Sequence, residues 1–246
     1  MAKIDKSKYT KAQWNKIKEQ RRVDKENDRR QKAIQNSIKL RDQEELPRNN
    51  TTDIAFVLGN GTSRKPIPVE ELSKYGKIYG CNALYRSFSP DYLIAVDVKM
   101  ILEINKAGYQ HKHEVWTNPN KTFNTTKNLN FFNPSKGWSS GPTALWLATK
   151  HRYKKIFILG FDYKGVNDGK SFNNIYADTN NYKKSTDGAT FFGNWMRQTR
   201  SVIQTNPQTE YIRVIQPDNY KPEELNTFDN YNTIYVEDFK KMFNIL

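Results

Sequence analysis

The sequence has very little cysteine. Cys81 is the single one among 246 residues, so no disulfide can form within one copy of the chain. This usage is typical of the reducing cytoplasm. The sequence also lacks an apolar stretch long enough to cross a membrane, and its beginning lacks the apolar core of a signal peptide. We therefore expect a soluble, cytoplasmic protein with no membrane span.

The first 46 residues contain neither glycine nor proline, which predicts one long helix over residues 7–46. Thr10 and Gln13 have the spacing of a capping box at its start. Residues 1–48 carry 15 Lys+Arg and 8 Asp+Glu, a net charge of +7 out of +14 for the whole chain. Apolar residues are sparse, which indicates a charged helical arm. Such an arm either keeps the protein soluble and docks a partner, or contacts an anionic partner such as nucleic acid or an acidic protein.

Residues 49–246 have a different pattern, in which short apolar runs alternate with segments of helical character. Continuous apolar strands separated by helices are typical of a mostly parallel sheet covered on both faces. We therefore predict an α/β domain of the Rossmann-like kind over residues 49–246. Ligands of such sheets gather at the carboxyl ends of the strands, so the residues that follow each strand are candidate site residues.

The first predicted strand, in "DIAFVLGNGTSRK", runs directly into Gly59, Asn60, Gly61, Thr62 and Ser63. Glycines let a backbone approach a ligand closely, and consecutive N–H groups with two hydroxyls can hold a phosphate. The stretch is neither the three-glycine dinucleotide motif nor a Walker loop, because no Gly-Lys-Ser/Thr follows. A plain tight turn explains it equally well.

Polar residues follow other predicted strands in the same way. Asn82 can donate and accept hydrogen bonds, as reading a base edge requires, or it can cap a turn. Asp97 can accept from a ribose hydroxyl or cap the following helix. Ser140 and Gly141 open a helix whose positive end faces the same edge of the sheet, and Asp162 follows the strand "IFILG". These residues predict one polar crevice.

The segments "VLGNGTSR", "GCNALY" and "SSGPTALWLATKHRYKKIFILGFDY" resemble the bacterial sialyltransferases of glycosyltransferase family 42 and the related MptE-like Rossmann proteins. The resemblance covers roughly residues 53–165. It implies a GT-A-like fold that binds a CMP-sugar without the usual DxD metal motif. It places the following residues around the nucleotide: Asn60, Thr62, Ser63, Asn82, Ser140 and Gly141.

The sequence departs from that family where the chemistry occurs. Thr62 stands where the sialyltransferases have proline, and Lys164 stands where they have tyrosine. Their catalytic base is a histidine downstream of these segments, whereas this chain has only His111, His113 and His151, none of which matches it. The resemblance therefore supports nucleotide binding more strongly than sialyl transfer.

A polar insertion over residues 166–195 follows, and long polar insertions at strand ends are often lids. Tyr176 and Tyr182 are candidates to donate hydroxyls to a leaving phosphate, and Lys164 to neutralise its charge, as are Lys183 and Lys184. Asp178 or Asp187 would serve as a general base if its pKa were raised. A solvated loop is the alternative.

Aromatic and histidine residues elsewhere give weaker signals. Phe131, Phe132 and Trp138 either stack on a base or sugar or pack a long loop against the sheet. His111 and His113 would share one face of a strand, but no cysteine or carboxylate cluster completes a metal shell, so we predict no metal site there.

The leading hypothesis is a nucleotide-sugar-dependent glycosyltransferase with a CMP-type donor, a glycan or other hydroxyl acceptor, and no required cofactor. One alternative is an MptE-like pyrophosphokinase that uses Mg²⁺, held on the side of Asp97 and Asp162. The other is a catalytically degenerate scaffold that binds nucleic acid or a partner protein through its basic arm.

Overall fold

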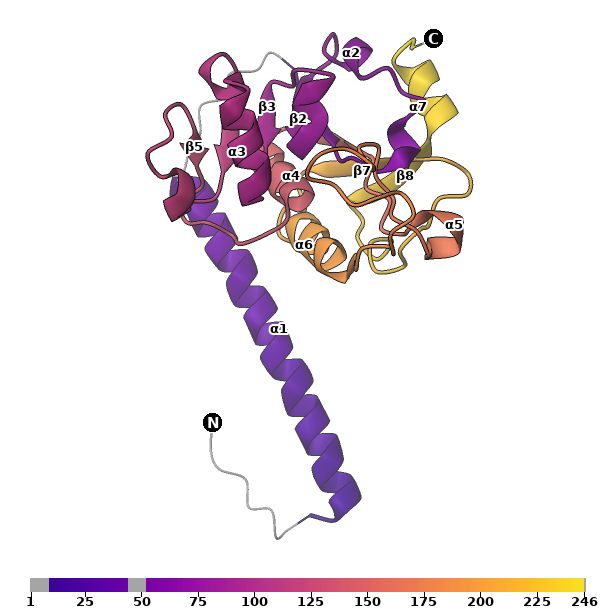
Figure 1. Cartoon of the computed structure of the whole chain (residues 1–246). Helices are drawn as coiled ribbons and strands as arrows, with labels where there is room; N and C mark the ends of the chain where they lie inside the picture. The colour runs from indigo at the N-terminus through magenta and orange to yellow at the C-terminus, as the bar shows by residue number, and fades with distance from the viewer. Residues whose placement is uncertain (1–8, 44–51, 246) are drawn as a thin grey trace. The chain divides into compact units, whose positions relative to one another are not determined.

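The computed structural model describes residues 9–43 and 52–245, and it divides the chain into two compact units, residues 1–45 and 46–246. In the first unit, helix α1 spans Lys11–Gln43 (Figure 1). Its capping box is confirmed, because the Thr10 N–H donates to Gln13 Oε1 at 2.9 Å and the Gln13 N–H donates to Thr10 Oγ1 at 3.3 Å. Residues 9 and 10, which were predicted to be helical, precede the helix, and the predicted residues 7–8 and 44–46 lie outside the described residues.

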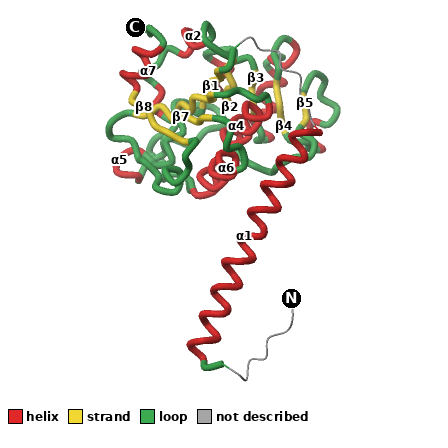
Figure 2. Tube along the Cα trace, turned by 180° about the vertical axis from the view of Figure 1, so that it is seen from behind, coloured by secondary structure: helices red, strands yellow, loops and turns green. Residues whose placement is uncertain are grey.

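The second unit is built on one eight-stranded sheet of order β5-β4-β3-β2-β1-β6-β7-β8, in which every neighbouring pair is parallel (Figure 2). The strands are β1 (Ile54–Leu58), β2 (Lys77–Cys81), β3 (Tyr92–Ile94), β4 (Val115–Thr117), β5 (Asn130–Phe131), β6 (Lys155–Leu159), β7 (Glu210–Ile215) and β8 (Tyr231–Tyr235). The order from β3 through β1 to β8 is that of a doubly wound Rossmann sheet, which confirms the predicted fold class.

Helices cover both faces of this sheet. The longer α-helices are α3 (Val98–Lys106), α4 (Ser140–Lys150), α6 (Gly193–Gln204) and α7 (Val236–Met242). The shorter ones are α2 (Val69–Leu72), α5 (Val166–Gly169) and the 3-10 helices η2 (Thr62–Arg64), η3 (Asn82–Arg86), η4 (Tyr109–His111) and η5 (Lys121–Phe123). Side chains alternate between the faces along each strand. In β1, Ala55 and Val57 belong to the core with α4 and α6, whereas Phe56 and Leu58 belong to the core with α2 and α7.

The strands and helices alternate as predicted. Near the C-terminus, β8 pairs with β7 and passes directly into α7, which begins at Val236. The edge strand β5 was not predicted. It has only two residues and pairs with β4 alone, so it leaves no strand pattern in the sequence. The predicted insertion corresponds to α5 followed by loops up to α6.

Candidate functional site

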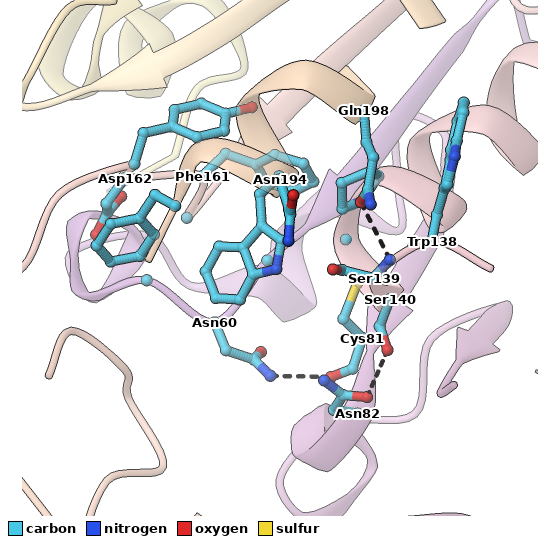
Figure 3. Close-up of a pocket in the computed structure, with 18 of the residues that line it drawn as sticks. Asn60, Cys81, Asn82, Trp138, Ser139, Ser140, Phe161, Asp162, Asn194 and Gln198 are labelled. Carbon is cyan, nitrogen blue, oxygen red and sulfur yellow. Dashed lines mark hydrogen bonds between the residues drawn. The ribbon is translucent and has the colours of Figure 1, made fainter. Parts of the chain in front are cut away.

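A cavity of about 380 Å³ opens at the carboxyl ends of β1 and β6, at the point where the chain turns to opposite sides of the sheet. This is where Rossmann-like sheets bind their ligands. Eight of the predicted site residues line it together: Gly59, Asn60, Gly61, Asn82, Asp97, Ser140, Gly141 and Asp162. In Figure 3, Asp162 and Trp138 lie at opposite sides of the view, with Asn60 and Asn82 below them.

Gly59 and Gly61 follow β1 at positions where the turn after β6 leaves no room for a Cβ atom. A Cβ on Gly59 would lie 2.5 Å from the Gly160 carbonyl oxygen, and a Cβ on Gly61 would lie 2.6 Å from the same oxygen and overlap the Asp162 carboxylate. The Gly61 N–H donates to Gly160 O at 2.9 Å. Close contact between the two turns is therefore sufficient to explain both glycines.

The hydroxyls of the same turn also have partners within the protein. The Thr62 N–H and hydroxyl both donate to Asn173 Oδ1 at 2.9 Å. Ser63 donates to the Asp162 carboxylate from its N–H, at 3.1 Å, and from its hydroxyl. Neither Thr62 nor Ser63 lines the cavity. The predicted phosphate cradle on residues 59–63 thus has its Gly61, Thr62 and Ser63 donors engaged in internal hydrogen bonds.

The Asn60 side chain connects the ends of two neighbouring strands, β1 and β2. Its amide nitrogen donates to Cys81 O at 3.0 Å and to the Tyr182 hydroxyl at 3.3 Å, and its oxygen accepts from Arg64 at 3.3 Å. Arg64 is buried, donates from Nε to Gly59 O at 2.6 Å, and has no carboxylate within ion-pair distance among the described residues. A buried positive charge with no close ion-pair partner in the described part of the chain therefore lies behind the turn that borders the cavity.

Ser140 joins three strand and helix ends at the cavity wall. Its hydroxyl donates to Asn82 Oδ1 at 2.8 Å and accepts from the Val96 N–H at 3.1 Å. The N–H groups of Ser140 and Gly141, in the first turn of α4, have no acceptor among the described residues. Such free N–H groups at a helix N-terminus attract anions. They are better placed to hold a phosphate than the turn after β1.

Asp97 occupies the N-cap position of α3, but its carboxylate makes no capping hydrogen bond. Partial desolvation raises its pKa above the ordinary value. Because the carboxylate lines the cavity without a capping partner, it is free to accept a ligand hydroxyl, as the sequence suggested.

Several lining residues were missed by sequence reasoning. Phe192, Asn194, Trp195 and Gln198 come from the start of α6, and Gln198 Oε1 accepts from the Ser139 N–H at 3.1 Å. The aromatic-rich stretch "FFGNW" at this helix start was the available signal. Trp138 also lines the cavity, whereas Phe132 is buried in the core beside Trp146.

The seven residues considered for catalysis all lie outside this cavity: Lys164, Tyr176, Asp178, Tyr182, Lys183, Lys184 and Asp187. Tyr176 is buried and its hydroxyl bonds to Ser87 Oγ at 2.9 Å, while burial raises the pKa of Tyr182, which bonds to Asn60, to about 12. Asp187 is exposed and accepts from the Lys184 N–H, and Lys164 is exposed in a neighbouring cavity.

Asp178 does not meet the condition set for a general base. Its carboxylate is exposed and accepts from the Ser185 N–H at 2.9 Å, and this hydrogen bond lowers its pKa instead of raising it. The insertion that carries these residues packs over the ends of β1 and β2. For example, the Ile175 N–H donates to Asn60 O at 2.8 Å.

The two neighbouring histidines are not on a strand. His111 ends the 3-10 helix η4, and His113 stacks on Tyr109 with ring centroids 4.2 Å apart, so the predicted shared face is wrong. Across residues 9–43 and 52–245, no three His, Cys, Asp or Glu side chains are grouped to hold a metal ion.

Comparison with known proteins gave no match among family models, curated proteins or solved structures. Within the part of the chain that the structure describes, no helix combines the length and apolarity that crossing a bilayer requires. The geometry of the cavity is therefore the basis for assigning a function.

Proposed function

We propose that the cavity binds the nucleoside phosphate of an activated sugar, and that the protein is a glycosyltransferase similar to the sialyltransferases, with a CMP-type donor favoured. One observation carries the proposal: the free N–H groups that open α4 meet a free carboxylate and aromatic walls in one cavity at the switch point of a Rossmann-like sheet. The cavity volume, about 380 Å³, falls within the usual range for small-molecule sites.

The phosphate would accept hydrogen bonds from the Ser140 and Gly141 N–H groups. The eleven-residue helix α4 and the buried Arg64 guanidinium favour negative charge there. Asp97 would accept from a ribose hydroxyl, and the Asn82 amide, whose oxygen already accepts from Ser140, would donate to the base or sugar. The Trp195 ring would supply an apolar face for the base.

In the proposed reaction, an acceptor hydroxyl oxygen bonds to the anomeric carbon while the bond from that carbon to the phosphate oxygen breaks. The nucleotide leaves with the electron pair, and the hydroxyl proton passes to a base or to solvent. Hydrogen bonds from the α4 N–H groups would stabilise the charge that develops on the leaving phosphate.

Isothermal titration of the full chain against CMP, CDP, UDP and GDP tests the donor site. We expect CMP to bind, and Trp195→Ala to weaken that binding about tenfold through loss of stacking, which is worth roughly 1 kcal/mol or more. Trp146→Ala is the matched control, because Trp146 packs against the core but does not line the cavity. Absence of binding by all four nucleotides at millimolar concentration would refute the proposal.

The Mg²⁺-dependent pyrophosphokinase is less well supported, because the Asp162 carboxylate already accepts two hydrogen bonds from Ser63. Turnover of ATP that depends strictly on Mg²⁺ would favour it over sugar transfer.

A second candidate function concerns α1, which forms a unit separate from the α/β domain and carries much of the positive charge. It would bind nucleic acid or another anionic partner. Duplex DNA binding should then weaken steeply with salt and should be lost when residues 1–48 are deleted. Equal binding by the truncated protein would exclude this role.

A further inference from the structure

A second cavity, of about 350 Å³, lies beside the first at the carboxyl ends of β6 and β7. Resting on the proposed function, we propose that it is the acceptor subsite and that it takes a neutral polyhydroxylated molecule, a saccharide. Its lining comes from three loops: Thr62 and Ser63 after β1; Asp162, residues 164–168 and Asn173 after β6; and Gln216 with residues 218–220 after β7.

The two cavities meet at Asp162 and Asn173, which line both of them. Asp162 is buried, and its carboxylate is fixed by the Ser63 N–H and hydroxyl. Asn173 is fixed as well, since its oxygen accepts from Thr62 and its nitrogen donates to Lys164 O at 2.9 Å. The two cavities are therefore adjacent, and an acceptor hydroxyl that reaches past these two side chains would meet the anomeric carbon of a donor bound in the first cavity.

The charge of the second cavity argues against a second phosphate. Three carboxylates line it, Asp162, Asp168 and Asp218, against one ammonium group, Lys164. The lining side chains thus sum to −2, and the buried Arg213 that bonds to Asp162 and Tyr220 brings the local balance to −1, whereas the chain as a whole carries +14. A phosphorylated ligand would be repelled here, while a neutral ligand with many hydroxyls would not.

The hydrogen-bonding groups suit such a ligand. Val166 contributes the one aliphatic side chain in the described lining, which otherwise presents carboxylates, amides, hydroxyls, an ammonium group and the Tyr220 ring. Asp218 and Lys164 are exposed, and the structure assigns neither side chain a hydrogen bond or an ion pair. Carboxylates accept from adjacent sugar hydroxyls and the ammonium donates to a third oxygen, so these two groups can bind without breaking internal contacts.

The loops around the cavity are joined by Arg213, which bonds to two lining residues without lining the cavity itself. This residue is buried, donates to Tyr220 O at 2.8 Å and to Asp162 O at 3.4 Å, and lies over the Tyr163 ring at 5.2 Å. Gln216 adds a bond from Nε2 to Ser63 O at 2.9 Å. The loops after β1, β6 and β7 are therefore held together before any ligand binds.

Saturation-transfer NMR on the full chain tests the inference, with glucose, galactose, N-acetylglucosamine and lactose as probes, each with and without CMP. We expect transfer to at least one sugar, retained in the presence of CMP. The double variant Lys164→Ala/Asp218→Ala should reduce the signal at least fivefold. Asp229→Ala is the control, because Asp229 is exposed and lines neither cavity.

The outcomes separate the two proposals. If CMP binds but no sugar gives transfer, or the double variant binds sugar as well as the wild type, the acceptor subsite is refuted and the donor site stands. If inorganic phosphate displaces the sugar, the cavity is an anion site and the inference is wrong. If a sugar binds at this cavity while no nucleotide binds, the saccharide site is supported and its role beside a donor is refuted.

Discussion

The Ser140 hydroxyl donates to Asn82 Oδ1 at 2.8 Å across 58 residues of sequence, and it accepts from the Val96 N–H at the same time. One side chain thereby connects the start of α4 with the ends of β2 and β3. Asn82 has a left-handed backbone, with φ of 51°, which is uncommon outside glycine and recurs at functional sites. The Ser140 hydroxyl therefore fixes Asn82 and Val96 against the start of α4 at the cavity wall.

Ser140→Ala should therefore lower both stability and nucleotide affinity. Removing the hydroxyl leaves Asn82 Oδ1 and the Val96 N–H without a partner, which costs about 1–3 kcal/mol. Urea unfolding and CMP titration measure the two effects. Ser139→Ala is the stability control, since the Ser139 side chain makes no hydrogen bond in the structure. Equal unfolding midpoints for the two variants would show that the hydrogen bonds of the Ser140 hydroxyl do not stabilise the protein.

Gly59 and Gly61 were predicted at the right place for a different reason. The sequence suggested contact with a ligand, whereas the structure shows contact with a neighbouring turn. The sequence placed Gly59 and Gly61 at the site, and both line the cavity. It could not show that the neighbouring turn at Gly160, about a hundred residues later, fills the space where their Cβ atoms would be. Strand-end position follows from local patterning, whereas the partner turn follows from which strands pair.

Gly61→Ala should destabilise the protein by about 1–3 kcal/mol or more, because the new methyl would overlap the Asp162 carboxylate and force the two turns apart. Gly188→Ala is the matched control, since a Cβ there meets no atom within 4 Å. Thermal unfolding compares the two variants. A Gly61→Ala protein as stable as Gly188→Ala would show that the turns can separate at little cost.

The sheet, its covering helices and the shared edge for Asn60, Asn82 and Ser140 were predictable, because apolar runs specify strands and parallel strands end at one edge. The aromatic stretch "FFGNW" marked Trp195 as unusual but did not place it at the cavity, since that position follows from the packing of α6 on α4. The same holds for the bond between Ser63 and Asp162, which joins residues 99 positions apart. Long-range pairings of this kind leave no local pattern.

Arg86 and Glu103 form an ion pair that also binds the insertion by hydrogen bonds, and the contribution of this pair to stability depends on pH. Arg86 contacts Glu103 at 2.7 Å, and it also donates to Thr179 Oγ1 and Asn180 O in the insertion. Hydrogen bonds from Arg86 lower the pKa of Glu103 to about 2 from 4.5. Since the native pKa is below the ordinary one, the unfolded state takes up the proton first as the solution is acidified.

This pair should stabilise the protein fully above about pH 4.5 and lose that contribution as the pH falls toward 2. In Glu103→Gln, the corresponding part of the pH dependence should be absent, and amides near Asn180 and Asn181 should exchange faster at neutral pH. Urea unfolding between pH 5 and 2.5 and hydrogen exchange measure this. Glu71→Gln, which removes an exposed pair with Lys74, is the control. A wild-type advantage over Glu103→Gln that stays constant with pH would contradict the assignment.

On acidification, His151 should produce a separate loss of stability, at a higher pH than the loss caused by Glu103. The imidazole is buried beside the Tyr79 hydroxyl, to which its Nδ1 is hydrogen-bonded, and burial lowers its pKa to about 4 from 6.5. The unfolded chain therefore binds this proton first, so stability should fall as the pH drops from about 6.5 to 4, by on the order of 3 kcal/mol in total. His151→Asn, which keeps a polar side chain without a titrating ring, should flatten the curve in this window. An NMR titration of the His151 ring with a midpoint near 6.5 in the native protein would rule out this explanation, because no stability could then be linked to its protonation.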